Sequence, residues 1–183
     1  KKIKDKFSVI GPHFLNASKS GHFQTNLKYK IKEIHNVHGS TMFFNKKIFN
    51  KNKGFDKNIF LYWEETDYTK RAKKNGYKAY QLNLVKVKHG KGEAVKTKDF
   101  YEKEKLKNLY IWHFIWSKFY YYKKHYGFVI SILFFLPIIL RTIFKILLNL
   151  LLNNKDNYER YKFRLNGIKA SIKGEKSILR PNL

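Results

Sequence analysis

Residues 54–76 of the chain read GFDKNIFLYWEETDYTKRAKKNG, and the rest of the sequence is organised around this stretch. The apolar, aromatic run 59–63 stops at three carboxylates, which are Glu64, Glu65 and Asp67. A helical pattern continues from there to Asn75. Gly76 follows it, and glycine is the residue that most readily adopts the left-handed conformation after a helix. The stretch therefore predicts a helix with an acidic first turn.

An ordinary structural role explains part of this pattern. Acidic side chains in a first turn are stabilised by the unpaired N–H groups there, and Asp67 and Arg71 have the spacing of four that allows an ion pair. The scarcity of carboxylates points to a functional role. The chain has only 13 acidic residues, and three of them lie within four positions beside the aromatic pair Tyr62 and Trp63. Both interpretations stay open at this point.

The length and composition limit the class of protein. A chain of 183 residues is long enough for one domain and an appendage. It starts Lys-Lys-Ile-Lys, its one methionine is Met42, and no signal-peptide pattern opens it, so we expect a fragment or a processed product. The absence of cysteine excludes disulfides and thiolate chemistry.

The net charge of +26 raises the possibility of a nucleic-acid partner. Lysine supplies 34 of the basic residues and arginine only five, although arginine is the usual reader of bases and phosphates. The charge also suits an anionic membrane surface or a phosphorylated ligand. Nucleic-acid binding remains an alternative, which would show itself as steeply salt-dependent affinity.

Hydrophobic patterning predicts several short elements in the first hundred residues. Residues 7–15 are expected to form a buried strand that runs into a turn at Gly11 and Pro12. The other expected elements are a strand at 37–44, a helical turn at 46–50, and strands at 77–82 and 84–87 separated by Asn83.

The C-terminal part changes to a helical pattern at residue 99. Residues 99–126 predict a helix that is rich in Trp and Tyr, as is typical of a membrane interface. An apolar run follows at 128–140, which is shorter than the roughly 20 residues that span a bilayer.

Extending this apolar run to Leu152 includes Pro137, Arg141 and Lys145, and cations near the middle of a spanning helix are costly. We therefore expect an in-plane or re-entrant pair of amphipathic helices bent at Pro137, with both cations on the headgroup side. A helical hairpin packed on the protein's own core is the alternative. Residues 153–183 predict a peripheral helix and a loose, basic tail.

An ordered series of motifs resembles a known family. The series consists of His38-Gly39-Ser40-Thr41-Met42-Phe43-Phe44, Lys53-Gly54-Phe55-Asp56, the run 59–67, Arg71, Gly76-Tyr77 and His89. It resembles the C-terminal half of the GT-A-fold glycosyltransferases, in particular the inverting, rhamnosyltransferase-like branch that builds O-antigens and other surface polysaccharides. The block 112–127 is similar to the C-terminal helices of that branch, so the resemblance covers roughly residues 7–127.

The resemblance implies an α/β fold. Residues 1–98 would form the C-terminal, acceptor-side half of a GT-A (Rossmann-like) catalytic domain. Residues 99–152 would form aromatic and amphipathic membrane-associated helices, and residues 153–183 a basic tail.

The resemblance also assigns roles to individual residues. It places the general base at Glu65, where the family has aspartate. The residues expected to orient the acceptor or the helix are Glu64, Asp67, Arg71, Tyr62, Trp63 and Gly39. His89 is expected near the donor diphosphate or its metal, although Glu93 and Ala94 stand where the family often has a serine.

The implied cofactor and partners follow from the same family. They are a nucleotide-sugar donor, a divalent metal (Mg²⁺ or Mn²⁺), a lipid-linked glycan acceptor and an anionic membrane surface at the cytoplasmic face of the inner or plasma membrane. The family's nucleotide-binding first half, with the Asp-x-Asp that holds the metal, has no counterpart in these 183 residues. We therefore expect this chain alone to be inactive. The alternative is a non-catalytic, basic membrane-binding module.

Overall fold

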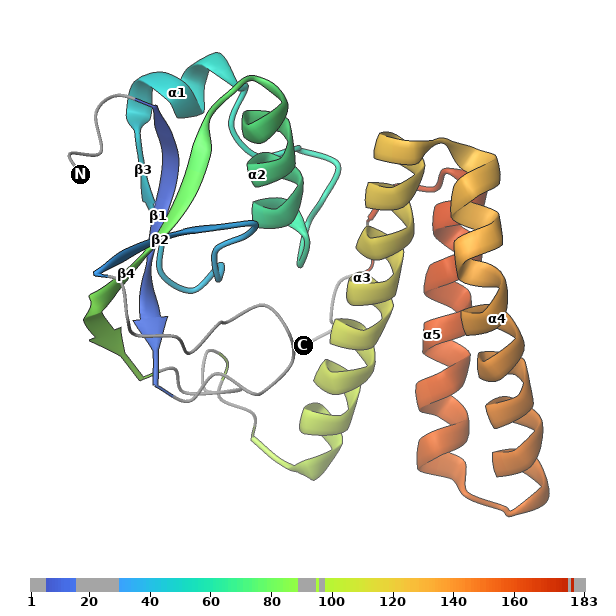
Figure 1. Cartoon of the computed structure of the whole chain (residues 1–183). Helices are drawn as coiled ribbons and strands as arrows, with labels where there is room; N and C mark the ends of the chain where they lie inside the picture. The colour runs from blue at the N-terminus through green and yellow to red at the C-terminus, as the bar shows by residue number, and fades with distance from the viewer. Residues whose placement is uncertain (1–5, 16–29, 89–94, 96–97, 178, 180–183) are drawn as a thin grey trace. The chain divides into compact units, whose positions relative to one another are not determined.

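The computed structural model describes residues 6–15, 30–88, 95, 98–177 and 179. The chain divides into two compact units, each described by itself (Figure 1). The first comprises Lys1–Asp56 and Glu64–Lys96, and the second comprises Lys57–Trp63 and Thr97–Leu183. The loop 57–63 thus groups with the C-terminal helices, although its neighbours on both sides in the sequence belong to the first unit.

The first unit contains a four-stranded mixed sheet, in agreement with the α/β class. Its strands are β1 (Phe7–Phe14), β2 (Ile31–Ile34), β3 (Phe43–Phe44) and β4 (Lys78–Val87), in the spatial order β2-β4-β1-β3. β1 and β4 are parallel, while the edge strands β2 and β3 run antiparallel to their neighbours. A parallel pair needs a long crossover, and here it contains both helices of this unit.

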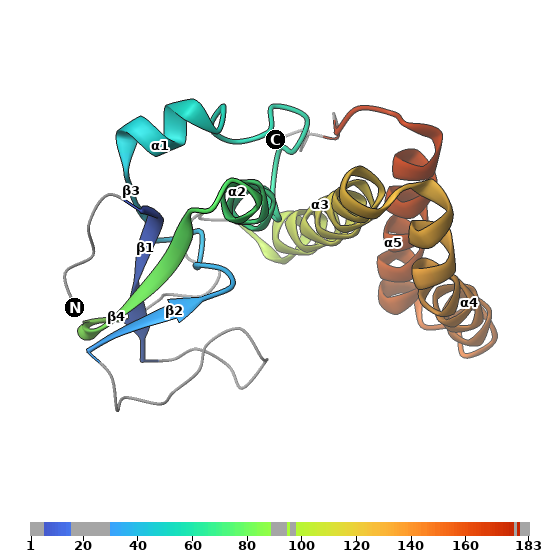
Figure 2. The same cartoon turned by 45° about the horizontal axis from the view of Figure 1, so that its top comes forward.

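The helices of the first unit are α1 (Lys46–Lys51) and α2 (Glu64–Lys74). Helix α2 lies beside the sheet (Figure 2). Its residues Tyr68 and Ala72 are fully buried and pack with residues of the sheet and the loop before β3. Around the Tyr68 ring lie three aromatic rings, with centroids 5.2–6.0 Å away, from Phe44, Phe49 and Phe55. This core fixes the face of α2 that is turned to the sheet. Gly76 follows the helix with φ of 80°, as the sequence predicted.

Two expected strand boundaries are wrong. β1 continues straight through Gly11 and Pro12 and does not turn there, and Pro12 stays in register with Leu82. The register shifts directly after Pro12, where β1 advances by one residue while β4 advances from Leu82 to Lys86, so the ladder is irregular at residues 83–85. β4 is likewise uninterrupted at Asn83, whose buried side chain accepts a hydrogen bond from Gln81 Nε2 at 2.7 Å.

The strand expected at residues 37–44 is mostly absent as well. Only Phe43 and Phe44 form β3, and a turn at Gly39 and Ser40 precedes them. The imidazole of His38 stabilises this turn, since its Nδ1 accepts from the Ser40 amide at 3.2 Å and lies 2.8 Å from Ser40 Oγ. A local side-chain bond of this kind competes with the strand.

The second unit consists of three helices, α3 (Phe100–Tyr126), α4 (Phe128–Leu151) and α5 (Lys155–Lys173). α5 packs against both other helices, and their shared core contains Ile115, Phe119, Phe135 and Ile168. The start of α3 agrees with the sequence-based boundary, because Asp99 caps it by accepting from the Glu102 amide at 2.8 Å.

Helix α4 is one continuous element. The sequence predicted two helices bent at Pro137, but the helix runs through this proline from residue 128 to 151. In the part of the chain that the structure describes, α4 is one helix with the length and apolar composition to cross a membrane. Of its apolar 18-residue stretch, 17% is buried. Its exposed apolar side chains include Val129, Leu133, Phe134, Leu140, Phe144 and Leu147.

The segment after α5 is held in place as far as it is described. His113 of α3 is fully buried; its Nε2–H donates to the Leu179 carbonyl at 2.7 Å, and its Nδ1 lies 2.9 Å from Ser177 Oγ. Trp116 Nε1 donates to the Glu175 carbonyl at 3.1 Å. The expectation of a loose tail therefore does not hold for these residues. Residues 178 and 180–183 lie outside the described part.

Gly167 allows α5 to approach α3 closely. A Cβ at this position would lie 2.7 Å from the Trp112 carbonyl oxygen and 2.8 Å from Ile115 Cγ2, and the backbone atom cannot give way cheaply. We expect Gly167→Ala to lower the free energy of unfolding by about 1–3 kcal/mol, although alanine is the better helix former. Urea unfolding measures the change, and Asn166→Ala on the exposed side of α5 is the control. A neutral or stabilising Gly167→Ala would contradict the close packing.

Candidate active site

The first turn of α2 places two carboxylates opposite a glycine. A Cβ added to Gly39 would lie 3.7 Å from both Glu64 Oε1 and Glu65 Oε2, at ordinary contact distance. Glu64 and Glu65 begin α2, while Gly39 belongs to the turn before β3, so the crossover brings together residues that are distant in the sequence. The backbone of Gly39 therefore lies beside both carboxyl groups.

Asn36 is a site residue that the sequence did not single out. Its Nδ2 donates to Thr66 Oγ1 at 2.7 Å, its Oδ1 accepts from the Val37 amide at 3.0 Å, and its side chain also forms a hydrogen bond with Glu65. Thr69 Oγ1 donates to the Glu65 carbonyl at 2.6 Å. These bonds fix the first turn of α2 against the loop before β3. A lone asparagine in a polar stretch carries no sequence signal of this role.

The electrostatics of the pair favour proton transfer near neutral pH. The pKa of Glu65 is raised from 4.5 to about 7, first by burial and then by the negative charge of Glu64, against the opposing effect of hydrogen bonds from its own backbone and from Asn36. Burial also raises the pKa of Glu64, whose Oε2 is buried and has no hydrogen-bond partner among the described residues. A carboxylate of this kind has the basicity that a general base needs.

The raised pKa of Glu65 predicts a pH-dependent stability. The folded state holds the proton of Glu65 more tightly than the unfolded chain does. The stabilisation that results is complete below about pH 4.5 and is lost as the pH rises through 7. Glutamine does not titrate, so the variant keeps the same stability where the wild type loses it. We expect the change in the free energy of unfolding caused by Glu65→Gln to be about 3 kcal/mol more stabilising at pH 8 than at pH 4. Urea unfolding of both proteins over this range measures the difference. A difference that does not change with pH would contradict the raised pKa.

Asp67 and Arg71 form the ion pair that their spacing predicts. Asp67 is fully buried, and its Oδ2 accepts from Arg71 Nε at 2.7 Å. The guanidinium also donates to the carbonyls of Asn52 and Gly54, the latter at 2.6 Å. Arg71 thereby ties α2 to the turn after α1. The position of Asp67 in the interior makes it a residue that positions the helix.

Tyr62 and Trp63 have an unusual backbone. Their φ angles are 63° and 73°, in the left-handed region that is unfavourable for residues with a Cβ. In the second unit their rings pack against aromatic side chains of α3, Tyr62 against Phe114 at 5.7 Å and Trp63 against Tyr121 at 5.1 Å. Both rings thus belong to the second unit, whereas the carboxylates that follow them belong to the first.

The expected metal-side residues are only partly described. His89, Glu93 and Ala94 lie outside the described residues, so the role expected of His89 stays a prediction. Among the residues that are described, no group of three or more His, Asp or Glu side chains could hold a metal ion, and Asp67 is engaged with Arg71. The divalent ion that the resemblance implies stays a prediction.

Comparisons of the chain with protein-family models, with curated proteins and with solved structures found no match. The geometry around Glu65 and the ordered motifs of the sequence therefore remain as indications of function. Both involve Gly39, Glu64 and Glu65, which are expected site residues and lie together in the fold.

Proposed function

We propose that the chain is the acceptor-and-base half of an inverting glycosyltransferase with a GT-A fold. The enzyme would move a sugar from a nucleotide-sugar donor to a lipid-linked glycan in the synthesis of a surface polysaccharide. The observation that carries this proposal is the carboxyl group of Glu65, which lies beside Glu64 and Gly39 and whose pKa is raised to about 7 by burial and by the charge of Glu64.

The proposed reaction uses Glu65 as the general base. Its carboxylate takes the proton of an acceptor hydroxyl while the hydroxyl oxygen attacks the anomeric carbon of the donor sugar. The bond between that carbon and the diphosphate oxygen breaks, and its electron pair leaves with the nucleoside diphosphate. Attack from the side opposite the leaving group inverts the anomeric configuration. Asn36 holds the first turn of α2, which carries the base, and Gly39 lies beside the base.

The complete product of the gene tests this assignment. We expect it to release nucleoside diphosphate from one member of a nucleotide-sugar panel when a membrane lipid extract supplies the acceptor. The 183-residue chain should not do so, and the upstream coding sequence should encode βαβ units that end in Asp-x-Asp. Sugar transfer by these 183 residues alone, or a start codon directly before Lys1, would contradict the proposal.

Peripheral association with the cytoplasmic face of the membrane is part of the same proposal. Two features favour this association. The first is the set of exposed apolar side chains of α4, and the second is the basic end of α3, where Lys123 and Lys124 precede Gly127. Each well-placed cation adds about 1 kcal/mol of attraction to anionic lipid. A non-catalytic membrane module, the second candidate, rests on α4 alone. It would bind vesicles without any transfer by the complete gene product.

A further inference from the structure

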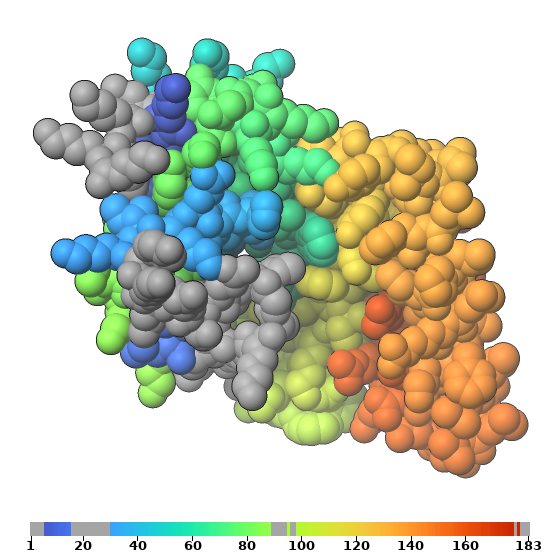
Figure 3. Space-filling view, viewed as in Figure 1, coloured from blue at the N-terminus to red at the C-terminus, as the bar shows by residue number. Residues whose placement is uncertain are grey.

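The three-helix unit contains an apolar pocket with one charged residue in its wall. The pocket has a volume of about 290 Å³, at the lower end of ligand-binding cavities. The residues that line it are Tyr62, Tyr110, Ile111, Phe114 and Arg164. All five belong to the second unit, and Arg164 comes from α5. In the space-filling view, atoms of α5 are visible between α3 and α4 (Figure 3).

Arg164 lacks a counter-ion in the part of the chain that the structure describes. Its Nε is buried without a hydrogen-bond partner, and no described carboxylate forms an ion pair with it. Burial lowers the pKa of its guanidinium, and the positive charges of Arg141 and Arg160 lower it further while Tyr161 opposes them. An unpaired buried donor of this kind is costly to a fold.

Other cations surround the same position. Three cations lie close enough for their charges and that of Arg164 to lower one another's pKa values: Arg141 of α4 and Arg160 of α5 act on Arg164, and Arg164 acts on Lys118 of α3. The chain has only five arginines, so three of them gather here from two helices. Burial lowers the pKa of Lys118, and the charge of Arg164 lowers it further. Such a cluster of like charges favours a bound anion.

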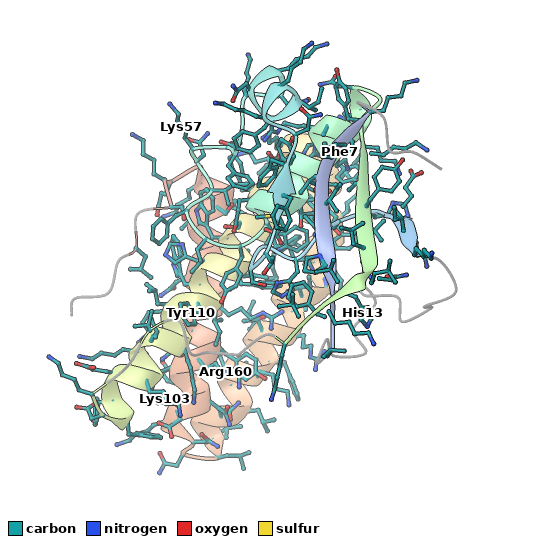
Figure 4. The ribbon with its side chains drawn as sticks, turned by 90° about the vertical axis from the view of Figure 1, so that its left-hand side faces the viewer. Phe7, His13, Lys57, Lys103, Tyr110 and Arg160 are labelled. Carbon is teal, nitrogen blue, oxygen red and sulfur yellow. The ribbon has the colours of Figure 1, made fainter. Side chains whose placement is uncertain are left out.

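A polar pocket adjoins the apolar one. It has a volume of about 340 Å³ and shares Tyr110 and Ile111 with the first. Arg160 also lines it from α5, and Tyr110 and Arg160 are both labelled in Figure 4. Asn108 and Asn157 add neutral hydrogen-bonding groups. The lining also contains the ion pair of Lys107 with Glu104 and the carboxylate of Asp156, so the pocket has mixed charge and an anion would have to lie beside Arg160. An amphiphilic molecule could therefore place an apolar part against Tyr62 and Phe114 and a polar part towards Arg160.

We propose that this pocket binds the phosphate group of an amphiphile, with the guanidinium of Arg164 as its main contact and Arg160 as a second cation. The forked donors of arginine match phosphate oxygens, and the site is already desolvated on its apolar side. Phosphate on an apolar chain fits the lining better than free phosphate, because four of the five residues of the first pocket present aromatic or aliphatic surface. The inference does not require the transferase assignment.

Flotation of the whole chain with vesicles tests the proposal. The vesicles contain phosphatidylcholine alone, with phosphatidylglycerol, or with a polyprenyl phosphate, and inorganic phosphate is added as a soluble competitor. We expect Arg164→Gln to weaken binding to the vesicles that contain polyprenyl phosphate by about tenfold, the value for one lost charged hydrogen bond, and to leave binding to phosphatidylcholine alone unchanged. Arg164→Lys should lose part of this affinity because it keeps the charge and loses the fork.

Lys169→Gln is the matched control, since it removes the same charge from an exposed position of α5. Equal losses in Arg164→Gln and Lys169→Gln would show general surface attraction and overturn the proposal. An affinity for inorganic phosphate equal to that for the lipid phosphate would overturn the amphiphile as ligand, because the apolar lining would then add nothing to binding. Arg164→Gln removes an unpaired cation, so its melting temperature should not fall. Leu133→Ser with Phe144→Ser tests α4 separately, because it should weaken binding to every vesicle whether or not Arg164 selects phosphate.

Discussion

Replacing Glu65 by glutamine is expected to lower the rate of sugar transfer by the complete gene product by about 10²–10⁴-fold, the usual contribution of a general base. Glutamine keeps the shape and the hydrogen-bonding capacity of the side chain, but it cannot accept a proton from the acceptor hydroxyl. The fold should be retained, because the substitution removes a buried carboxyl whose ionisation opposes folding. Release of nucleoside diphosphate and the circular dichroism spectrum measure the two effects.

Glu65→Asp is the matched control for this prediction. It keeps the carboxylate, shortens its reach by one methylene and restores the residue that the resembling family has at this position. We expect it to retain much more activity than the glutamine variant. If Glu65→Gln turns over at the wild-type rate, Glu65 is only a residue of the first helical turn and the proposed mechanism fails.

Replacing Arg71 by leucine is expected to lower the free energy of unfolding by about 3–5 kcal/mol, the usual cost of leaving a buried charge without its partner. The substitution removes the guanidinium that pairs with the carboxylate of Asp67, which is fully buried in the first unit. It also removes the donors to the carbonyls of Asn52 and Gly54, so the turn after α1 loses its tie to α2. Urea unfolding followed by circular dichroism measures the loss.

Two further variants make this prediction specific. Lys74→Leu, at an exposed position of the same helix, should change stability by no more than about 0.5 kcal/mol. Asp67→Asn combined with Arg71→Leu should recover part of the loss, because the uncompensated charge is then gone. A cost below about 1 kcal/mol for Arg71→Leu would show that the ion pair does not hold α2 in place.

The bounds of α2 and the start of α3 could be predicted because their signals are local, whereas α4 was wrongly divided at Pro137. The acidic first turn and Gly76 bound α2, and the cap at Asp99 starts α3 where the pattern changes. The strands were harder, since a strand is decided by its neighbours. Pro12 lies inside β1, and the register shifts directly after it. Pro137 lies inside α4 with the helix continuous on both sides.

The candidate site shows a similar limit. Glu64, Glu65 and Gly39 could be named from the motifs, and the Asp67–Arg71 pair follows from helical spacing. The burial that raises the pKa of Glu65, and the bonds that Asn36 makes to α2, depend on how the crossover folds back. Arg164 was also missed, because only the packing of α3 on α5 shows that its Nε is buried and unpaired.

Carbon-13 NMR titration of the glutamate carboxyl groups tests the central claim most directly, and it needs neither donor nor acceptor. The account predicts one carboxyl group that titrates near pH 7, disappears in Glu65→Gln, and moves to lower pH in Glu64→Gln because the neighbouring charge is removed. If every glutamate of the folded protein titrates near its ordinary value of 4.5, Glu65 is not poised as a base and the proposed function loses the observation that carries it.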